Sequence, residues 1–168
     1  MGTMLQHSDL LIEEFTKALK SAAYFSLENS EIIHEAIQAP HDYPDLPTGM
    51  CAVYVFSLRS NTLAPAGPNR VLKVGKAGFN SQARFKYQHY KSDSATSTLA
   101  GAIKNNRILW DYIGYDTSSQ NLDSWLRANT DRDHFFLSAQ RQNILTLLKA
   151  YIRGVLGPVY EGSLKGIE

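Results

Sequence analysis

Two short apolar segments, close together in the chain, constrain this sequence more than any other feature. The first reads Met-Cys-Ala-Val-Tyr-Val-Phe-Ser-Leu at 50–58, and the second reads Arg-Val-Leu-Lys-Val-Gly at 70–75. Both are rich in β-branched and aromatic residues, and the residues between them include proline, glycine and asparagine. This pattern is typical of two strands joined by a loop. We therefore predict a β-hairpin formed by residues 51–58 and 70–75, with a long connection.

A turn and a short basic helix follow the hairpin. Gly78, Asn80 and Ser81 interrupt the strand pattern, and serine is a favoured residue at the start of a helix. The helix predicted after this turn carries Arg84 and His89.

The N-terminal residues have the spacing of helices. Apolar side chains recur every three or four residues from Ser8 to about Phe25, which predicts a helix with one apolar face. A second short helix is expected from about Asn29, with Ile33 and Ile37 directed inward.

The C-terminal half contains several further elements. Residues 108–115 are apolar and aromatic, which favours a strand, and residues 122–128 favour a short helix. The aromatic segment at 134–137 is the expected third main strand, within roughly 133–138. Residues 140–155 have the pattern of a helix with a broad buried face.

Composition sets limits on the kind of protein. The chain has 168 residues, enough for one domain but short for two. Its formal net charge of +1 means that any nucleic-acid binding must come from a local basic patch. The single cysteine excludes a disulfide framework and a cysteine-rich zinc site. We expect a cytoplasmic protein without a membrane partner, because no apolar run spans a bilayer and no signal peptide opens the chain.

The hairpin and the basic helix resemble the core of the GIY-YIG nuclease family. In that family a Gly-Ile-Tyr segment pairs with a Tyr-Ile-Gly segment on the next strand, and a helix with an essential arginine follows. Ala52-Val53-Tyr54 and Lys73-Val74-Gly75 stand at the two name positions here, and Arg84 and His89 fall where the arginine helix is expected. The resemblance covers roughly residues 50–90 and 143–161.

The resemblance implies a fold and its division along the chain. It implies an α+β domain, a small antiparallel sheet flanked by helices, over residues 49–168. Residues 1–48 would form an N-terminal helical extension that packs on this domain or contacts a partner.

The resemblance also implies a chemistry, the hydrolysis of phosphodiester bonds in DNA with Mg or Mn. Tyr54 would help to activate the attacking water, and Arg84 would hold the scissile phosphate with its planar guanidinium. Lys76 and His89 would support the phosphate or move a proton. Lys73 replaces the second tyrosine of the family, and its ammonium can still donate to a phosphate. A plainer interpretation makes Tyr54 a core residue, Arg84 part of a solvated face and His89 a packing residue.

The metal position departs from the family pattern. In the family, an acidic residue on the last helix binds the metal before a Pro-x-Tyr-Asn ending. Pro158-Val159-Tyr160 matches that ending, and counting back places Lys149 at the acidic position. An ammonium has no lone pair for a cation. Lys149 could mark a natural binder that does not cleave or an engineered inactive form, or Glu161 could have taken over the metal. A solvated surface lysine is the plain alternative.

Three functions therefore stand side by side at this point. The first is a metal-dependent endonuclease acting on DNA. The second is a nucleic-acid-binding or protein-interaction module on the same fold, with a protein partner or a second copy of the chain as its target. The third, favoured only by the glycines of Gly75-Lys76-Ala77-Gly78, is an unrelated enzyme for a phosphate ligand, but the spacing of a P-loop is absent.

Overall fold

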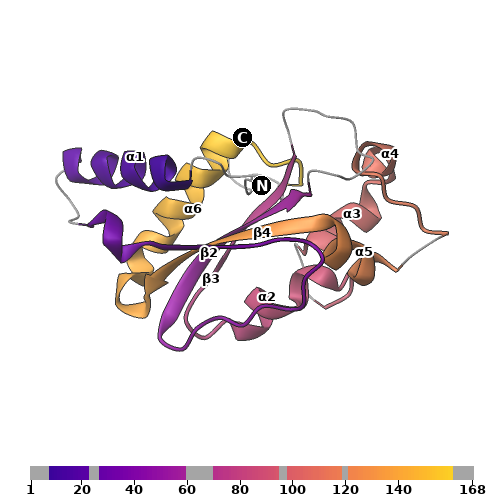
Figure 1. Cartoon of the computed structure of the whole chain (residues 1–168), viewed down its shortest axis with the longest axis horizontal. Helices are drawn as coiled ribbons and strands as arrows, with labels where there is room; N and C mark the ends of the chain where they lie inside the picture. Colours follow the sequence, from indigo (N-terminus) through magenta and orange to yellow (C-terminus); the bar gives the residue numbers. More distant parts are fainter. Residues whose placement is uncertain (1–7, 23–26, 60–69, 95–97, 119–120, 161–168) are drawn as a thin grey trace, which may run out of the picture.

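The computed structural model describes residues 8–22, 27–59, 70–94, 98–118 and 121–160 (Figure 1). In chain order, its elements are α1 (Ser8–Ser21), the one-turn 3₁₀ helix η1 (Asn29–Glu31), β1 (Ile33–Ile37), β2 (Met50–Leu58), β3 (Val71–Ala77), α2 (Gln82–Lys86), η2 (Gln88–Tyr90), α3 (Leu99–Asn105), η3 (Arg107–Leu109), α4 (Trp110–Ile113), α5 (Leu122–Asn129), β4 (Thr130–Ser138), η4 (Ala139–Arg141) and α6 (Gln142–Leu156).

The four strands form one antiparallel sheet in the order β1-β4-β2-β3. The predicted hairpin is confirmed, since β2 pairs with β3 and Tyr54 lies opposite Gly75. The third main strand is also confirmed, but β4 begins at Thr130 and is longer than the aromatic segment suggested. The molecule is therefore an α+β domain built on a small antiparallel sheet.

The second N-terminal helix was a wrong prediction. Residues 29–31 make a single 3₁₀ turn, and residues 33–37 form β1, which pairs with β4 from Ile33 opposite Phe136 to Ile37 opposite Arg132. β-branched isoleucines suit an extended strand better than a helix. The N-terminal segment thus contributes an edge strand to the sheet and is not purely a helical extension.

The strand expected over residues 108–115 was also wrong. Residues 107–109 form η3 and residues 110–113 form α4, which ends at Gly114 with a φ of 70°. This left-handed conformation favours glycine and commonly ends a helix. The Trp110 indole N–H donates to the carbonyl of Ile103 at 2.8 Å, so the segment is held to α3.

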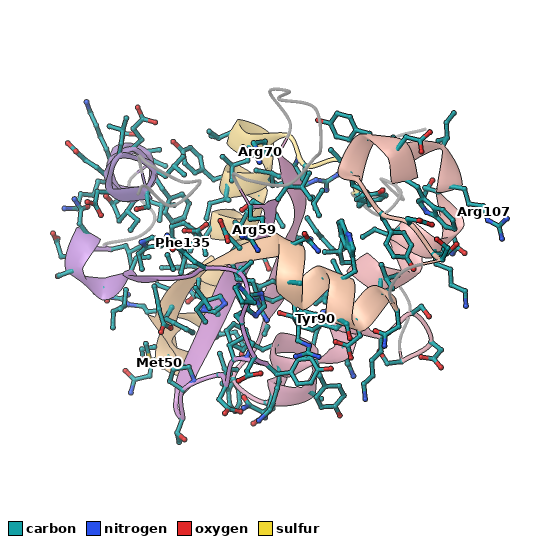
Figure 2. All side chains as sticks on the ribbon, turned by 45° about the vertical axis from the view of Figure 1, so that its right-hand side comes forward. Met50, Arg59, Arg70, Tyr90, Arg107 and Phe135 are labelled. Carbon is teal, nitrogen blue, oxygen red and sulfur yellow. The ribbon has the colours of Figure 1, made fainter. Side chains whose placement is uncertain are left out.

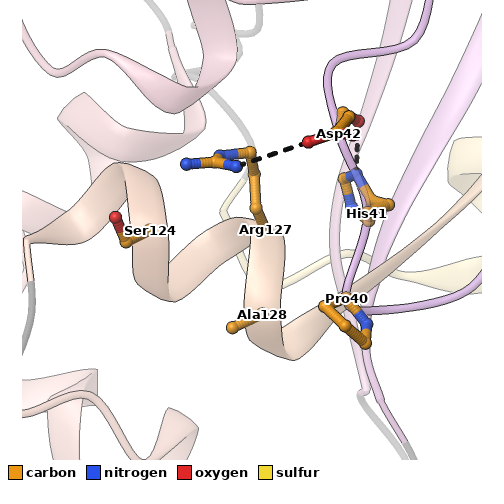
Figure 3. Close-up of a pocket in the computed structure, with 6 residues that line it drawn as sticks. All are labelled: Pro40, His41, Asp42, Ser124, Arg127 and Ala128. Atoms are coloured by element: carbon orange, nitrogen blue, oxygen red, sulfur yellow. Dashed lines mark hydrogen bonds and ion pairs between the residues drawn. The ribbon is translucent and has the colours of Figure 1, made fainter.

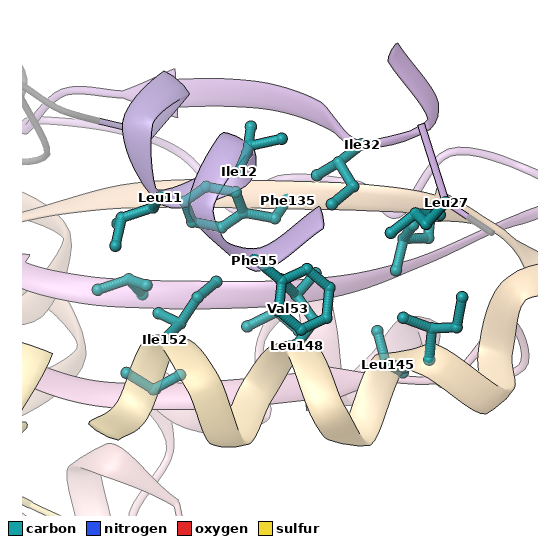
Figure 4. Close-up of a cluster of buried hydrophobic side chains, with 14 of the residues drawn as sticks. Leu11, Ile12, Phe15, Leu27, Ile32, Val53, Phe135, Leu145, Leu148 and Ile152 are labelled. Carbon is teal, nitrogen blue, oxygen red and sulfur yellow. The ribbon is translucent and has the colours of Figure 1, made fainter. Parts of the chain in front are cut away.

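Helices cover both faces of the sheet (Figure 1). On one face, Val53 and Phe135 pack against α1 and α6, through Phe15 and Leu148 among others (Figure 4). On the other face, Tyr54 and Phe56 of β2 belong to a second cluster of buried side chains, to which α2, η2, α3 and α5 also contribute. Phe135 and Tyr90 mark these two sides in Figure 2.

The last residues that the structure describes form hydrogen bonds along the outer edge of β3. After α6 ends at Gly157, the amides of Val159 and Tyr160 donate to the carbonyls of Val71 and Leu72 at 3.0 and 2.8 Å. Tyr160 is 3% exposed, so this corner packs into the domain.

Candidate phosphate site

Tyr54 lies at the centre of the site, in the middle of β2. Its side chain is fully buried on the face covered by α2, η2 and α3. Across the hairpin, Gly75 is its partner, and a Cβ added to Gly75 would overlap the Tyr54 ring. The ring therefore occupies the space that any other residue at position 75 would fill.

His89 contacts the hydroxyl of Tyr54, and its surroundings determine which nitrogen carries the proton. Its Nε2 lies 2.5 Å from the Tyr54 oxygen. The backbone N–H of Leu99 donates to its Nδ1 at 3.2 Å. A neutral imidazole has one donor and one acceptor nitrogen. Because Nδ1 accepts, we assign the proton to Nε2, which then donates to the Tyr54 oxygen.

Arg84 also acts on this hydroxyl. It lies half-buried on α2, and both its charge and a hydrogen bond lower the pKa of Tyr54. Burial opposes these effects and is stronger, so the pKa of Tyr54 is raised to about 12. Tyr54 therefore keeps its proton at neutral pH. With His89 and Arg84 donating to its oxygen, the hydroxyl can donate its own proton to a bound anion.

Lys73 enters the site from β3. It is 4% exposed, and its ammonium donates to the carbonyl of Tyr160 at 3.3 Å. Lys73 is paired with Phe56 in the hairpin, on the same face as Tyr54. Lys73 thus brings a buried positive charge beside the C-terminal corner.

Several cations act together on His89. Burial lowers the pKa of His89 well below its ordinary value, and the charges of Arg84, Lys73, Arg132 and Lys149 lower it further. These four charges are all positive, which keeps the imidazole neutral. Lys149 is half-buried on α6, and its effect on His89 places its charge within electrostatic range of the site. The structure therefore brings Tyr54, Arg84 and His89 into contact, and the charges of Lys73 and Lys149 act on His89. We call these five residues the Tyr54 group.

Lys76 does not join this group, which corrects our prediction for it. It pairs with Val53, whose side chain packs on the opposite face of the sheet. Its exposed ammonium donates to the hydroxyl of Thr146 on α6 at 2.6 Å. Successive side chains of a strand point to opposite faces, so Lys73 and Lys76 cannot share one site. Glu161, the other candidate metal ligand, lies outside the described residues.

Two residues of β4 that the sequence did not single out also reach the site. Arg132 and His134 are both fully buried, and His134 is the cross-strand partner of Tyr54. Burial and the neighbouring charges lower the pKa of His134 to about 2. In the sequence, both residues lie in the polar run Thr-Asp-Arg-Asp-His at 130–134, which directly precedes the aromatic segment that predicted the strand.

Two pockets on the described surface lie away from this site. One, of about 440 Å³, is lined by residues of the β1–β2 connection and of α5 (Figure 3). Its Arg127 is paired with Asp123 at 3.0 Å and with Asp42 at 3.8 Å. The other, of about 480 Å³, lies against α1 and includes Asp9, Glu13 and His34. Neither contains a residue of the Tyr54 group.

The residues of the Tyr54 group do not fit a divalent metal. Arg84, Lys73 and Lys149 are donors without a lone pair for a cation, and Mg²⁺ prefers carboxylate and carbonyl oxygens. Within the part of the chain that the structure describes, no three His, Cys, Asp or Glu side chains come together as a metal site. The donor chemistry of this group suits an anion.

Searches against known protein families, curated protein sequences and solved structures give no match to this chain. None of the helices in the described segments has the length and apolar character needed to cross a bilayer.

Proposed function

We propose that the Tyr54 group binds a phosphate of DNA, in the manner of a GIY-YIG nuclease core whose last helix carries a lysine at the metal position. The observation that carries this proposal is the hydrogen-bonded Tyr54–His89 pair, with Arg84 acting on both residues and the charges of Lys73 and Lys149 acting on His89. A basic cluster of this kind supplies local affinity for a polyanion although the net charge of the chain is only +1.

Each member has a distinct part in this binding. Arg84 and Lys149 are half-buried and are the members that a phosphate meets first. Arg84 grips two phosphate oxygens, because a guanidinium presents paired N–H donors. Tyr54 donates its hydroxyl proton to a third oxygen, while His89 holds the Tyr54 oxygen in place. Tyr54 is fully buried and Arg84 hydrogen-bonds to its hydroxyl, so in this proposal Arg84 turns from Tyr54 to the phosphate as the phosphate enters.

The proposal is tested by DNA binding of three proteins, measured by fluorescence anisotropy of a labelled duplex. Arg84→Ala should weaken binding by about 10-fold or more, since a hydrogen bond to a charged group contributes roughly 1.5–3 kcal/mol. The matched control is Lys17→Ala, which removes an exposed cation of α1 across the sheet. It should bind within about twofold of the parent. Equal affinities of all three proteins would refute the proposal.

A second candidate function is metal-dependent cleavage of DNA. It is favoured by the Tyr54–His89–Arg84 arrangement, which suits proton transfer beside a held phosphate. It requires a carboxylate, either Glu161 or one introduced at position 149. Plasmid cleavage with Mg or Mn, by the parent and by Lys149→Glu, separates the two functions. If Lys149→Glu cleaves and the parent does not, the parent chain is a DNA-binding protein without nuclease activity. If the parent cleaves, it is an active nuclease.

A further inference from the structure

Arg132 is a charged residue buried among aromatic rings. Its guanidinium is fully buried, with its central carbon 4.6 Å from the ring centre of Phe56, 4.9 Å from that of Phe85, 5.4 Å from that of Tyr54 and 5.8 Å from that of Tyr90. It forms none of the ion pairs seen among the described residues. Its Nε has no hydrogen-bond partner there either.

Such a charge is costly to bury. Removing an ion from water has a penalty of several kcal/mol, which only good partners offset. The four aromatic faces attract the cation, and the effect of each grows in a site without water. A hydrophobic side chain of similar size would nevertheless fill this core without the penalty. The position of Arg132 therefore calls for a reason beyond packing.

The two hydrogen bonds of Arg132 supply that reason. One Nη donates to the carbonyl of Phe85 at 3.0 Å, and the other donates to the hydroxyl of Tyr90 at 3.1 Å. Phe85 is the residue after Arg84, and Tyr90 is the residue after His89. One buried guanidinium thus holds both ends of the segment that carries these two members of the site.

We infer that Arg132 is a positioning residue of the Tyr54 group, which fixes the α2–η2 segment to β4 and places a permanent positive charge beneath the Tyr54–His89 pair. The inference rests on the proposed function in so far as the group binds phosphate. A fixed charge behind the site adds to the attraction of a bound anion without contacting it, because the interior screens charges less than water does.

The charge of Arg132 acts on three ionisable side chains around the site. Burial raises the pKa values of Tyr54 and Tyr90 and lowers that of His89, and the charge of Arg132 acts to lower all three. The other charged groups that act on His89 are Arg84 from α2, Lys73 from β3 and Lys149 from α6. All have the same sign, so removal of Arg132 should raise the pKa of His89 in part, while burial and the remaining cations continue to lower it.

The test compares Arg132→Met, which removes the charge and keeps the bulk, with Arg132→Lys, which keeps the charge and loses the paired donors. The imidazole ¹⁵N shifts of His89 are followed from pH 4 to 7, with DNA affinity measured in parallel. Arg132→Met should shift the titration of His89 to higher pH and weaken binding of a DNA duplex roughly 5-fold. Arg132→Lys should leave the titration close to that of the parent but still weaken binding, because the segment is no longer held.

An unchanged His89 titration and unchanged DNA affinity in Arg132→Met would overturn the inference. If that variant does not fold, Arg132→Lys and Tyr90→Phe decide the question. Both should weaken DNA binding while His89 stays neutral, and parent-like binding in both would overturn the positioning role. Failure of the parent to bind DNA removes the proposed function, but the His89 titration still tests whether Arg132 acts on the site.

Discussion

The ring of Tyr54 lies in the space left by the missing side chain of Gly75, its partner across the hairpin. The two residues therefore depend on each other, because the tyrosine can point toward His89 only when position 75 has no Cβ. The glycine here has a packing role on an extended strand, and no unusual backbone angle is needed to explain it.

Gly75→Ala should destabilise the protein. The added methyl group must displace the Tyr54 ring in a packed core, which typically costs about 1–3 kcal/mol. Chemical denaturation measures the loss in the free energy of unfolding. The control is Gly154→Ala on α6, where a new Cβ meets no atom within 4 Å. That variant should be more stable by about 0.5–1 kcal/mol, as alanine is the better helix former. A Gly75→Ala protein as stable as its parent would contradict the packing seen here.

Tyr54→Phe tests the assignment of the His89 proton to Nε2. Without the hydroxyl, the Nε2–H of a buried imidazole loses its acceptor, which costs about 1–3 kcal/mol. Proton-coupled ¹⁵N spectra should show His89 protonated at Nε2 in the parent. Tyr87→Phe, which changes an exposed ring, should alter the free energy of unfolding by less than about 0.5 kcal/mol. A proton found on Nδ1 in the parent would refute the assignment.

Stability should fall as the pH is lowered from 7 to 5. Burial is the largest cause that lowers the pKa values of His41, His89 and His134 in the folded protein, the last from 6.5 to about 2. Below pH 6.5 the unfolded chain binds protons that the folded chain does not, so protons favour unfolding. Each deeply buried histidine then contributes a loss of roughly 1 kcal/mol per pH unit.

His134→Leu isolates one part of this dependence. It removes a base whose two ring nitrogens have no hydrogen-bond partner among the described residues. Any cavity that it leaves has the same cost at every pH, so the slope of the free energy of unfolding against pH is diagnostic. The slope between pH 6.5 and 5 should be shallower than that of the parent. Identical slopes would mean that His134 is not neutral in the folded protein.

The sequence predicted the parts of the fold that local patterns determine. The hairpin around Tyr54 and the final helix follow from residue type and periodicity, and both are present. β1 was missed because Ile33 and Ile37 fit an inward helix face as well as a strand. What decides between the two is pairing with β4, about one hundred residues further along the chain, which no local pattern records.

The positions of some residues around Tyr54 could be predicted from the sequence, and those of others could not. Tyr54, Arg84 and His89 are in contact, and the charges of Lys73 and Lys149 act on His89. Their roles in a phosphate site stay a prediction. Lys76 was misplaced, although strand alternation alone separates it from Lys73. Arg132 was missed because a charged residue at the start of a strand is usually exposed, and only the tertiary structure shows that four aromatic rings surround it.

The salt dependence of DNA binding tests the central claim most directly. Each cation that neutralises a phosphate releases a counterion, so the slope of log affinity against log salt becomes shallower by about 0.9 for each phosphate that is no longer neutralised. Because the Tyr54 group binds one phosphate, the slope should be shallower by about 0.9 in the double variant Arg84→Ala/Lys149→Ala, and Arg84→Ala alone should give part of that change. Lys17→Ala should keep the slope of the parent. Slopes that are the same in the parent, the double variant and the control would contradict a phosphate site at Tyr54.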